Sequence, residues 1–393
     1  MEKKKTFIMG MAAGMAAMML LIFALAPIRA QIIWSGLLPP EAKILEIYSL
    51  LSEHSIVPVD KAVLLDNMYR GLLEGVGDRY TYYFDRESFA VFRERTAGVF
   101  TGIGMQVILD PEDNLTTVVN VFSGTPAEEA GLLPGDKILA VDRADVTGKR
   151  LEEVIALIKG EVGTQVQLRI LRGEDRFSLD ITRQRIQVPT VSHKMLENNI
   201  GYLHISGFEG VTYEQFEAAY LDLRRQGLQG LIIDLRNNGG GLLCSVIDIS
   251  NLVLPRGVVL YVENNRGERT AHMSDDDMHM ALPLVMLVNN GSASASEVLT
   301  GAVRDHGVGT VVGQQTFGKG VVQHMLPLTD GSAIKVTVAR YYTPSGISIH
   351  EEGITPDFIV EVDRETAMQS ARLTLEEDIQ LQKAIEVMKN KMD

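Results

Sequence analysis

Two apolar runs in the second half of the chain constrain the fold more than any other feature. Residues 230–236 are almost continuously apolar and lead into an Asn-Asn-Gly-Gly-Gly loop, and residues 281–288 lead into an Asn-Asn-Gly loop. A helical pattern follows each loop. Strands that are apolar throughout are buried on both faces, and strands that alternate with helices indicate a parallel sheet. The region after Val188 is therefore predicted to be an α/β domain, with a further strand at 310–312 and a hairpin at 321–326 and 332–339.

Earlier in the chain the patterns are different. From Phe100 to Gln184 short strands alternate with turns, which predicts a compact β module. Its expected strands are 107–109, 117–121, 137–141, 166–170 and 177–181, with one helix at 150–158. Helical periodicity marks residues 40–95 and the tail 374–392, where Thr374 and Glu377 make a capping box.

Length, charge and cysteine content narrow the class of protein. At 393 residues the chain can form two or three domains, each with its own core. Its net charge of −14 gives no basic field that would attract nucleic acid. Cys244 is the single cysteine, so no intramolecular disulfide or cysteine-based zinc site can form. Its apolar neighbours predict buried packing rather than reactivity.

The amino terminus has the pattern of an export segment. Lysines at 3–5 precede an uncharged run over 7–27, and Arg29 follows it. A positive flank stays in the cytoplasm and directs the following chain across the membrane. At about 20 residues the run can span a bilayer and exceeds an ordinary signal-peptide core. We predict a membrane anchor over 7–27, with a signal peptide cleaved after Ala26 or Ala30 as the alternative, and an extracytoplasmic location, periplasm or cell surface, for the rest.

The β module carries a specific motif. Residues 123–139 read Ser-Gly-Thr-Pro-Ala-Glu-Glu-Ala-Gly-Leu-Leu-Pro-Gly-Asp-Lys-Ile-Leu, which resembles a PDZ domain. Upstream, Gly102, Ile103, Gly104 and Met105 are similar to the loop by which PDZ domains receive a peptide's carboxyl terminus. Glycines let successive N–H groups form an anion nest, and the adjoining strand edge pairs with an extended peptide. The alternative is that these glycines only form turns.

A serine-rich junction follows the second apolar strand and allows two interpretations. Ser294 and Glu297 match the S-x-x-E capping box, which by itself explains both residues. Alternatively, Ser294 is a nucleophile at the positive end of a helix, where free N–H groups stabilise an oxyanion. The junction alone favours the cap.

Lys319 is a candidate general base. It stands between two glycines, with apolar Phe317 and Val321 close in sequence. Desolvation would lower the pKa of its amine and make it usable as a base near neutral pH. A Ser–Lys pair then needs no histidine. The alternative for a lysine between glycines is a solvated loop.

Together these stretches resemble the carboxy-terminal processing, or tail-specific, proteases of peptidase family S41. The matching motifs are the PDZ module, residues 234–241, the serine junction, the Phe-Gly-Lys-Gly loop and residues 353–357. The resemblance implies a serine protease core similar to the crotonase and ClpP fold. It also implies a role for each site residue: nucleophile, Ser294; general base, Lys319; residue orienting the lysine, Gln323; oxyanion donors, the N–H groups of Ala295 and of Gly240 or Gly241.

Other parts of the sequence match different chemistries less completely. Residues 313–320 match G-x-x-x-x-G-K of a phosphate-binding loop, but Gly320 replaces the Mg²⁺-binding hydroxyl and a strand follows where a helix is required. A Ser–His–Asp hydrolase would use His306 or His324 as base. The acidic run 275–277 is typical of a solvated loop rather than a metal site. The non-enzymatic alternative is a membrane-tethered PDZ scaffold with an inactive protease-like domain.

The sequence thus predicts a multidomain α/β protein in which a PDZ β-module with flanking helices is joined to a protease core. Its predicted parts are a signal peptide or membrane anchor at 1–30, a helical region at 31–97, the PDZ domain at 98–184, the S41 core at 185–363 and an amphipathic helix at 364–393. The predicted partners are protein carboxyl termini, the membrane and, through the apolar faces of both ends, a second copy of the chain. The proposed chemistry needs no cofactor, metal or nucleic acid.

Overall fold

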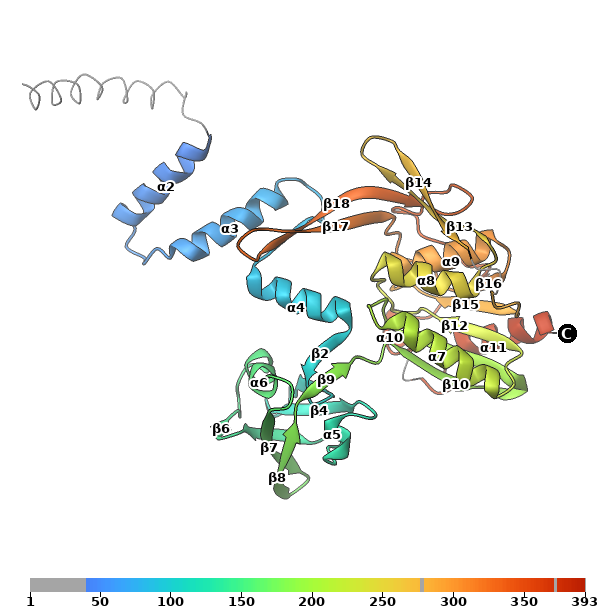
Figure 1. Ribbon diagram of the computed structural model, residues 1–393, viewed down its shortest axis with the longest axis horizontal. Helices are drawn as coiled ribbons and strands as arrows, with labels where there is room; N and C mark the ends of the chain where they lie inside the picture. The colour runs from blue at the N-terminus through green and yellow to red at the C-terminus, as the bar shows by residue number, and fades with distance from the viewer. Residues whose placement is uncertain (1–39, 276–278, 371–372, 393) are drawn as a thin grey trace, which may run out of the picture. The chain divides into compact units, whose positions relative to one another are not determined.

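The structure, a computed structural model, describes residues 40–275, 279–370 and 373–392. The predicted anchor at 7–27 lies outside these ranges. Within them, no helix has the length and apolar character needed to cross a membrane. The chain divides into two compact units; the first ends at Gly75 and the second begins at Val76. The described part of the first unit contains α2 (Pro40–His54) and α3 (Lys61–Glu74) (Figure 1). The side chain of Asp60 caps α3.

The predicted PDZ module lies in the second unit and includes an antiparallel pair, β2 (Val99–Gly102) and β9 (Gln184–Gln187). The main sheet has the order β3-β4-β5-β7-β8, and β6 pairs with β5. Alternate residues of β7 are buried, as expected for a sheet with one face on the core. The strand β3 lies at an edge of this sheet, so one side of it is free to pair with an extended chain. The elements are β3 (Met105–Leu109), β4 (Thr116–Val121), α5 (Pro126–Glu129), β5 (Lys137–Val141), β6 (Ala144–Asp145), α6 (Leu151–Ile158), β7 (Gln165–Arg172) and β8 (Asp175–Thr182).

The predicted protease core is built on a six-stranded sheet with the order β10-β11-β12-β15-β16-β19. Every neighbouring pair is parallel except β10 with β11. Because parallel strands end at the same edge, the loops after β12 and β15 lie side by side. The strands are β10 (Val191–Met195), β11 (Ile200–Ile205), β12 (Gly230–Asp234), β15 (Leu284–Val288), β16 (Gly309–Gly313) and β19 (Phe358–Ile359), with a 3₁₀ turn, η1 (Glu197–Asn199), before β11.

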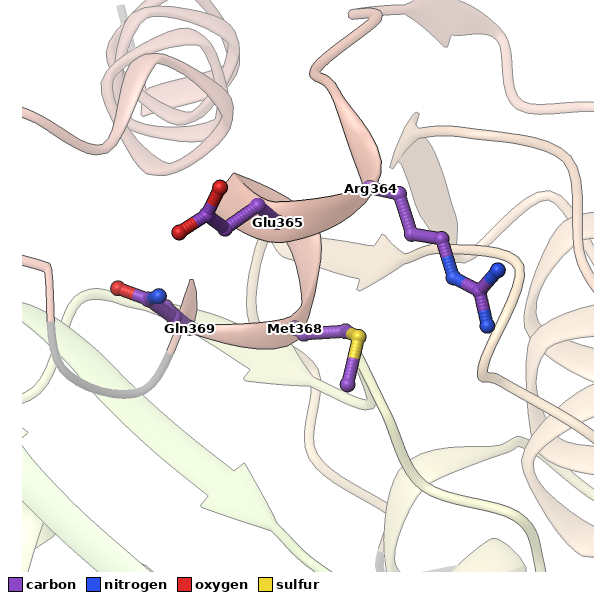
Figure 2. Close-up of a pocket in the computed structure, with 4 residues that line it drawn as sticks. All are labelled: Arg364, Glu365, Met368 and Gln369. Carbon is purple, nitrogen blue, oxygen red and sulfur yellow. The ribbon is translucent and has the colours of Figure 1, made fainter.

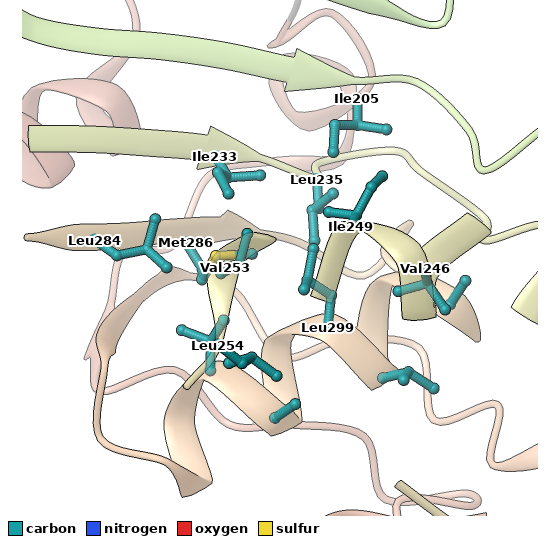
Figure 3. Packing of buried hydrophobic residues seen from close by; sticks show 14 of the residues in the cluster. Ile205, Ile233, Leu235, Val246, Ile249, Val253, Leu254, Leu284, Met286 and Leu299 are labelled. Carbon is teal, nitrogen blue, oxygen red and sulfur yellow. The ribbon is translucent and has the colours of Figure 1, made fainter. Parts of the chain in front are cut away.

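Helices cover both faces of this sheet. Leu231 and Ile233 of β12 belong to the core formed with α7 (Thr212–Arg225), α8 (Leu243–Val253) and α9 (Ala295–Asp305), part of which is drawn in Figure 3. Ile232, between them in sequence, packs instead with Leu381 and Ala384 of α11 (Ile379–Met392). Burial on both faces accounts for the continuous apolar pattern of the strand.

A second sheet contains a strand that the sequence did not reveal. β1 (Tyr82–Phe84) lies inside the stretch that was predicted to be helical, and it pairs with β18. The helix α4 (Arg86–Ala97) follows β1. A strand of three residues is too short to produce a recognisable period. The sheet has the order β1-β18-β13-β14, with β17 also on β18; its other strands are β13 (Gly257–Asn264), β14 (Arg269–Ser274), β17 (Val321–Pro327) and β18 (Ala333–Tyr342).

The tail helix begins later than predicted. Thr374 and Glu377 do form their side-chain bonds, but α11 begins at Ile379, after Asp378, whose Oδ1 accepts the N–H of Leu381. Its apolar side is buried against the sheet, whereas the predicted apolar residue Leu375 is 46% exposed. The prediction that this helix offers a free apolar face was therefore wrong. A short helix, α10 (Arg364–Met368), precedes it.

Candidate active site

Ser294 lies at the junction between β15 and α9, as predicted. Its backbone dihedrals are φ 56° and ψ −113°, outside the helical and extended regions. Such a conformation in a non-glycine residue stores strain that surrounding contacts must offset. Ala295 is the first residue of the helix, so its N–H has no acceptor within the helix. A half-buried hydroxyl therefore stands beside a backbone donor that the hydrogen bonds of the helix leave unused.

The carboxylate of Glu297 ties the serine junction to the lysine loop. It is fully buried, and its Oε2 accepts the N–H groups of Ser294 and Lys319, each at 2.9 Å. Its Oε1 accepts the N–H of Gly318 at 2.7 Å and the hydroxyl of Thr316 at 2.5 Å. A buried carboxylate needs such partners. One side chain thus fixes the backbone at both predicted catalytic positions, a role beyond the predicted cap.

A buried tyrosine makes a second connection between the same two residues. The hydroxyl of Tyr341 lies between the carbonyl oxygens of Ser294, at 3.1 Å, and Lys319. Burial raises the pKa of Tyr341 well above the ordinary tyrosine value, and the charge of Glu297 adds to the effect. The phenol therefore stays protonated and available as a donor.

The side chain of Lys319 is half-buried. Its Nζ lies 5.0 Å from the centroid of the Tyr80 ring, and the guanidinium of Arg79 lies 4.8 Å from the same centroid. No hydrogen bond joins this Nζ to Ser294 Oγ in the part of the chain that is described. Burial lowers the pKa of Lys319, the charge of Lys335 lowers it further, and Glu297 opposes both. The amine is thus easier to deprotonate than a free lysine.

The loop after β12 reaches the serine through Gly240. A Cβ placed on Gly240 would lie 2.7 Å from Ser294 Cβ and 2.9 Å from the amide nitrogen of Ala295. The N–H of Gly240 donates to Asn238 Oδ1 at 2.8 Å. The N–H of Gly241 has no acceptor among the described residues. Of the two glycines predicted as oxyanion donors, Gly241 is therefore the one with a free N–H.

The side chain of the predicted orienting residue bonds to the backbone rather than to the lysine amine. Gln323 Nε2 donates to the carbonyl of Val321 at 3.2 Å, and the register of β17 against β18 shifts between Val322 and Gln323. Such a bulge changes the direction of a side chain. No hydrogen bond between Gln323 and Lys319 Nζ is present in the described ranges.

The rival bases and the phosphate loop do not fit this geometry. His306 follows the far end of α9, about 16 Å from Ser294 for an eleven-residue helix. Its Nε2 lies 2.7 Å from the carbonyl oxygen of Val258, and His324 is exposed. The strand β17 begins at Val321, so no helix terminus follows the G-x-x-x-x-G-K match.

The predicted peptide loop of the PDZ module leads into the edge strand β3. Gly104 has φ 93°, and a Cβ there would lie 2.3 Å from Thr125 Cβ. Its carbonyl accepts the N–H of Phe122 at 2.9 Å, and Ile103 is buried in the core of the module. Only glycine fits this close approach. The loop thus leads directly into an edge strand, as the predicted peptide-binding role requires.

Two other features involve none of the predicted catalytic residues. A surface hollow of about 510 Å³ is lined by Arg364, Glu365, Met368 and Gln369 of α10 and its end (Figure 2). None of these is a predicted site residue. Cys244 is exposed, so the prediction that it is buried was wrong; Ser245, Val246 and Ile249 occupy the inner side of α8 instead.

Comparisons with known proteins give the family. Residues 199–360 match the model of peptidase family S41, and residues 117–172 match that of the PDZ domain. The chain is 37% identical to the carboxyl-terminal-processing protease of Synechocystis over 323 residues, covering 81% of this chain and 75% of that protein. The chain belongs to the carboxy-terminal processing proteases of family S41. The resemblance found in the sequence is confirmed, as is the fold class of a PDZ domain joined to an S41 protease domain.

Two further comparisons agree with this family. The carboxy-terminal processing protease CtpA of Bacillus subtilis is 35% identical over 322 residues, covering 81% of this chain and 69% of that protein. A solved structure described as an S41 protease of Bacteroides fragilis superposes with a TM-score of 0.53 at 15% identity, covering 88% of this chain and 97% of that one. At that identity it supports the fold alone.

Proposed function

We propose that this S41 protease is a Ser–Lys endopeptidase that binds the carboxyl termini of exported proteins with its PDZ domain and cleaves peptide bonds near them. The observation that carries the proposal is the buried Glu297 carboxylate, which holds the backbones of Ser294 and Lys319 together. The lowered pKa of Lys319 supports its part as the base.

In the proposed cycle the neutral amine of Lys319 leaves the Tyr80 ring and takes the proton of Ser294 Oγ. The oxygen then attacks the scissile carbonyl, and the N–H groups of Ala295 and Gly241 donate to the resulting oxyanion. The lysine passes its proton to the leaving amine, and water hydrolyses the acyl-enzyme. Gln323 would accept a hydrogen bond from the lysine once the amine has moved.

The sequence also supports a proposal for the location and assembly of the enzyme. The run at 7–27 would anchor the chain to the cytoplasmic membrane, leaving the PDZ domain (98–184) and the core (185–363) outside the cytoplasm. A homodimer would form through the amino-terminal helices, because Leu45, Leu50 and Leu72 of α2 and α3 are exposed. This leaves α11 out of the dimer contact.

The test of the function is digestion of an unstructured reporter protein that carries or lacks an apolar carboxyl terminus. We expect wild-type enzyme to cleave the tail-bearing reporter faster and the Ser294→Ala variant to cleave neither. Mass spectrometry of the fragments measures both rates and the cut position. Cleavage by Ser294→Ala would reject the serine nucleophile, and equal cleavage of both reporters would reject selection by the tail.

The PDZ loop provides a separate prediction. Gly104→Ala places a Cβ against Thr125 at a positive φ, which costs about 1 kcal/mol or more. We expect binding of a labelled peptide with an apolar, free carboxyl terminus to weaken by about five- to tenfold. Fluorescence anisotropy measures the affinity. Glu174→Gln, in the exposed turn between β7 and β8, is the control, and unchanged affinity in Gly104→Ala would contradict the assigned loop.

A further inference from the structure

A buried ion cluster lies directly before the oxyanion loop. Arg236 is 2% exposed, and its guanidinium donates hydrogen bonds to two carboxylates. Its Nη2 donates to Asp234 Oδ2 at 2.6 Å and to Asp378 Oδ2 at 2.7 Å, while its Nη1 donates to Asp378 Oδ1 at 2.8 Å. The hydroxyl of Tyr202 donates to Asp234 at 2.7 Å. Two-pronged pairs of this kind fix orientation as well as adding energy.

Asp378 brings the tail of the chain into this cluster. It is 3% exposed and caps α11, whose buried side packs on the sheet that carries β12. Gln380 supports the same contact, since its Oε1 accepts from Arg236 Nη1 at 3.2 Å and its Nε2 donates to the carbonyl of Val360 at 2.8 Å. The arginine is thus held by residues that lie 142 and 144 positions later in the chain.

The other tail element, α10, holds the next residue of the loop. Asn237 has φ 60°, and its Nδ2 donates to the carbonyl of Ala367 at 2.8 Å and to Ser370 Oγ at 3.0 Å. Figure 2 shows the side chains of Arg364 and Met368 projecting from the same short helix into the surface hollow. The backbone of α10 therefore contacts the loop while these side chains extend elsewhere.

From there the loop runs on to the nucleophile. The carbonyl of Asn238 accepts the N–H of Ala293 at 3.0 Å and the hydroxyl of Ser296 at 2.9 Å. Gly240 then lies against Ser294. A shift at Arg236 or Asn237 would consequently move the N–H group that we propose as an oxyanion donor.

We propose that the tail is part of the catalytic apparatus: Asp378, through Arg236, and α10, through Asn237, hold the 237–241 loop at the distance from Ser294 that oxyanion stabilisation requires. Asp378 is a positioning residue, since it touches neither substrate nor reacting atoms. The inference rests on the function proposed above. Misplacement of such a donor by about 1 Å costs about a hundredfold in rate.

The test compares Asp378→Ala and Asp378→Asn with wild type in the full chain. Each is assayed for kcat and KM on a tail-bearing peptide, for inhibition by a peptide boronate of the same sequence, and for Tm. We expect kcat to fall about 10- to 100-fold with KM within about twofold. The boronate, which forms a tetrahedral adduct, should lose affinity by the same factor as kcat/KM. A purely structural role would lower Tm without this matched loss.

The control is Glu386→Gln, which breaks an exposed ion pair with Lys383 on the same helix and should leave every value unchanged. Asp378→Asn keeps the side-chain volume, so it decides the question if the alanine variant does not fold. Wild-type kcat in Asp378→Asn, or unaltered boronate affinity, would overturn the inference. Ser294→Ala is assayed in parallel: if it is inactive while Asp378→Asn is normal, only the positioning role fails, and if it is active the proposed function fails.

Discussion

Replacing Lys319 with alanine should lower kcat/KM for a tail-bearing protein by about 10⁴-fold or more, to the level of Ser294→Ala. A nucleophile and its base act as one unit, so the double variant should be no slower than either single one. Fragment release measured by mass spectrometry checks all three. Residual activity in Lys319→Ala that is absent from Ser294→Ala would mean that another group takes the proton.

The role of Lys319 as the base also predicts the direction in which activity changes with pH. The base must be neutral, so activity should rise with pH through the lowered pKa of Lys319. Lys335→Met removes the neighbouring positive charge that lowers this pKa, so the rise should move to higher pH. The profile of kcat/KM against pH measures the shift. Lys383→Met, on the tail helix, is the charge-matched control, and an identical profile in Lys335→Met would contradict the assignment of the base.

The second large effect is expected for Glu297→Gln. In the wild type the Glu297 carboxylate accepts hydrogen bonds from the backbone N–H groups of Ser294 and Lys319. Glutamine has one acceptor oxygen, so its amide N–H₂ would face N–H donors instead of accepting from them. We expect kcat to fall about 10²- to 10³-fold, since both catalytic residues lose their common anchor. We also expect the free energy of unfolding to fall by about 3 kcal/mol.

Steady-state kinetics and urea unfolding measure the two consequences separately. The matched control is Glu214→Gln, an exposed glutamate in the first turn of α7. That variant should keep wild-type kcat and stability. If Glu297→Gln turned over at the wild-type rate, the link between the serine junction and the lysine loop would have no catalytic importance.

The sequence revealed most of the fold where burial is two-sided. Strands β12 and β15 were predicted because they are apolar on both faces: Ile233 and Met286 pack in one layer, and Ile232 and Val285 pack in the other. β1 was missed because three residues carry no period. The start of α11 was misplaced because Thr374 and Asp378 are both good caps, and the choice between them depends on Arg236, which is distant in sequence.

A residue of the candidate site could be predicted only where that residue belongs to a local sequence motif. Ser294 and Lys319 lie in such motifs, and their roles stay predictions. The wider role of Glu297 depends on donors 19 to 22 positions away, which no local pattern shows. Gln323 was expected beside the lysine, but a shift in strand register, invisible in the sequence, places its amide against Val321.

Arg236 and Asp378, which are joined by a hydrogen bond, lie 142 positions apart in sequence. The two residues are therefore synthesised at different times. A chain is made from its amino terminus, so the 237–241 loop leaves the ribosome long before its distant support exists. Contacts of such long range also form late in folding, since a large loop must close first. If the tail positions the loop as we propose, a growing or partly exported chain carries the serine but no organised oxyanion site. The incomplete active site is therefore not yet able to cleave newly made protein.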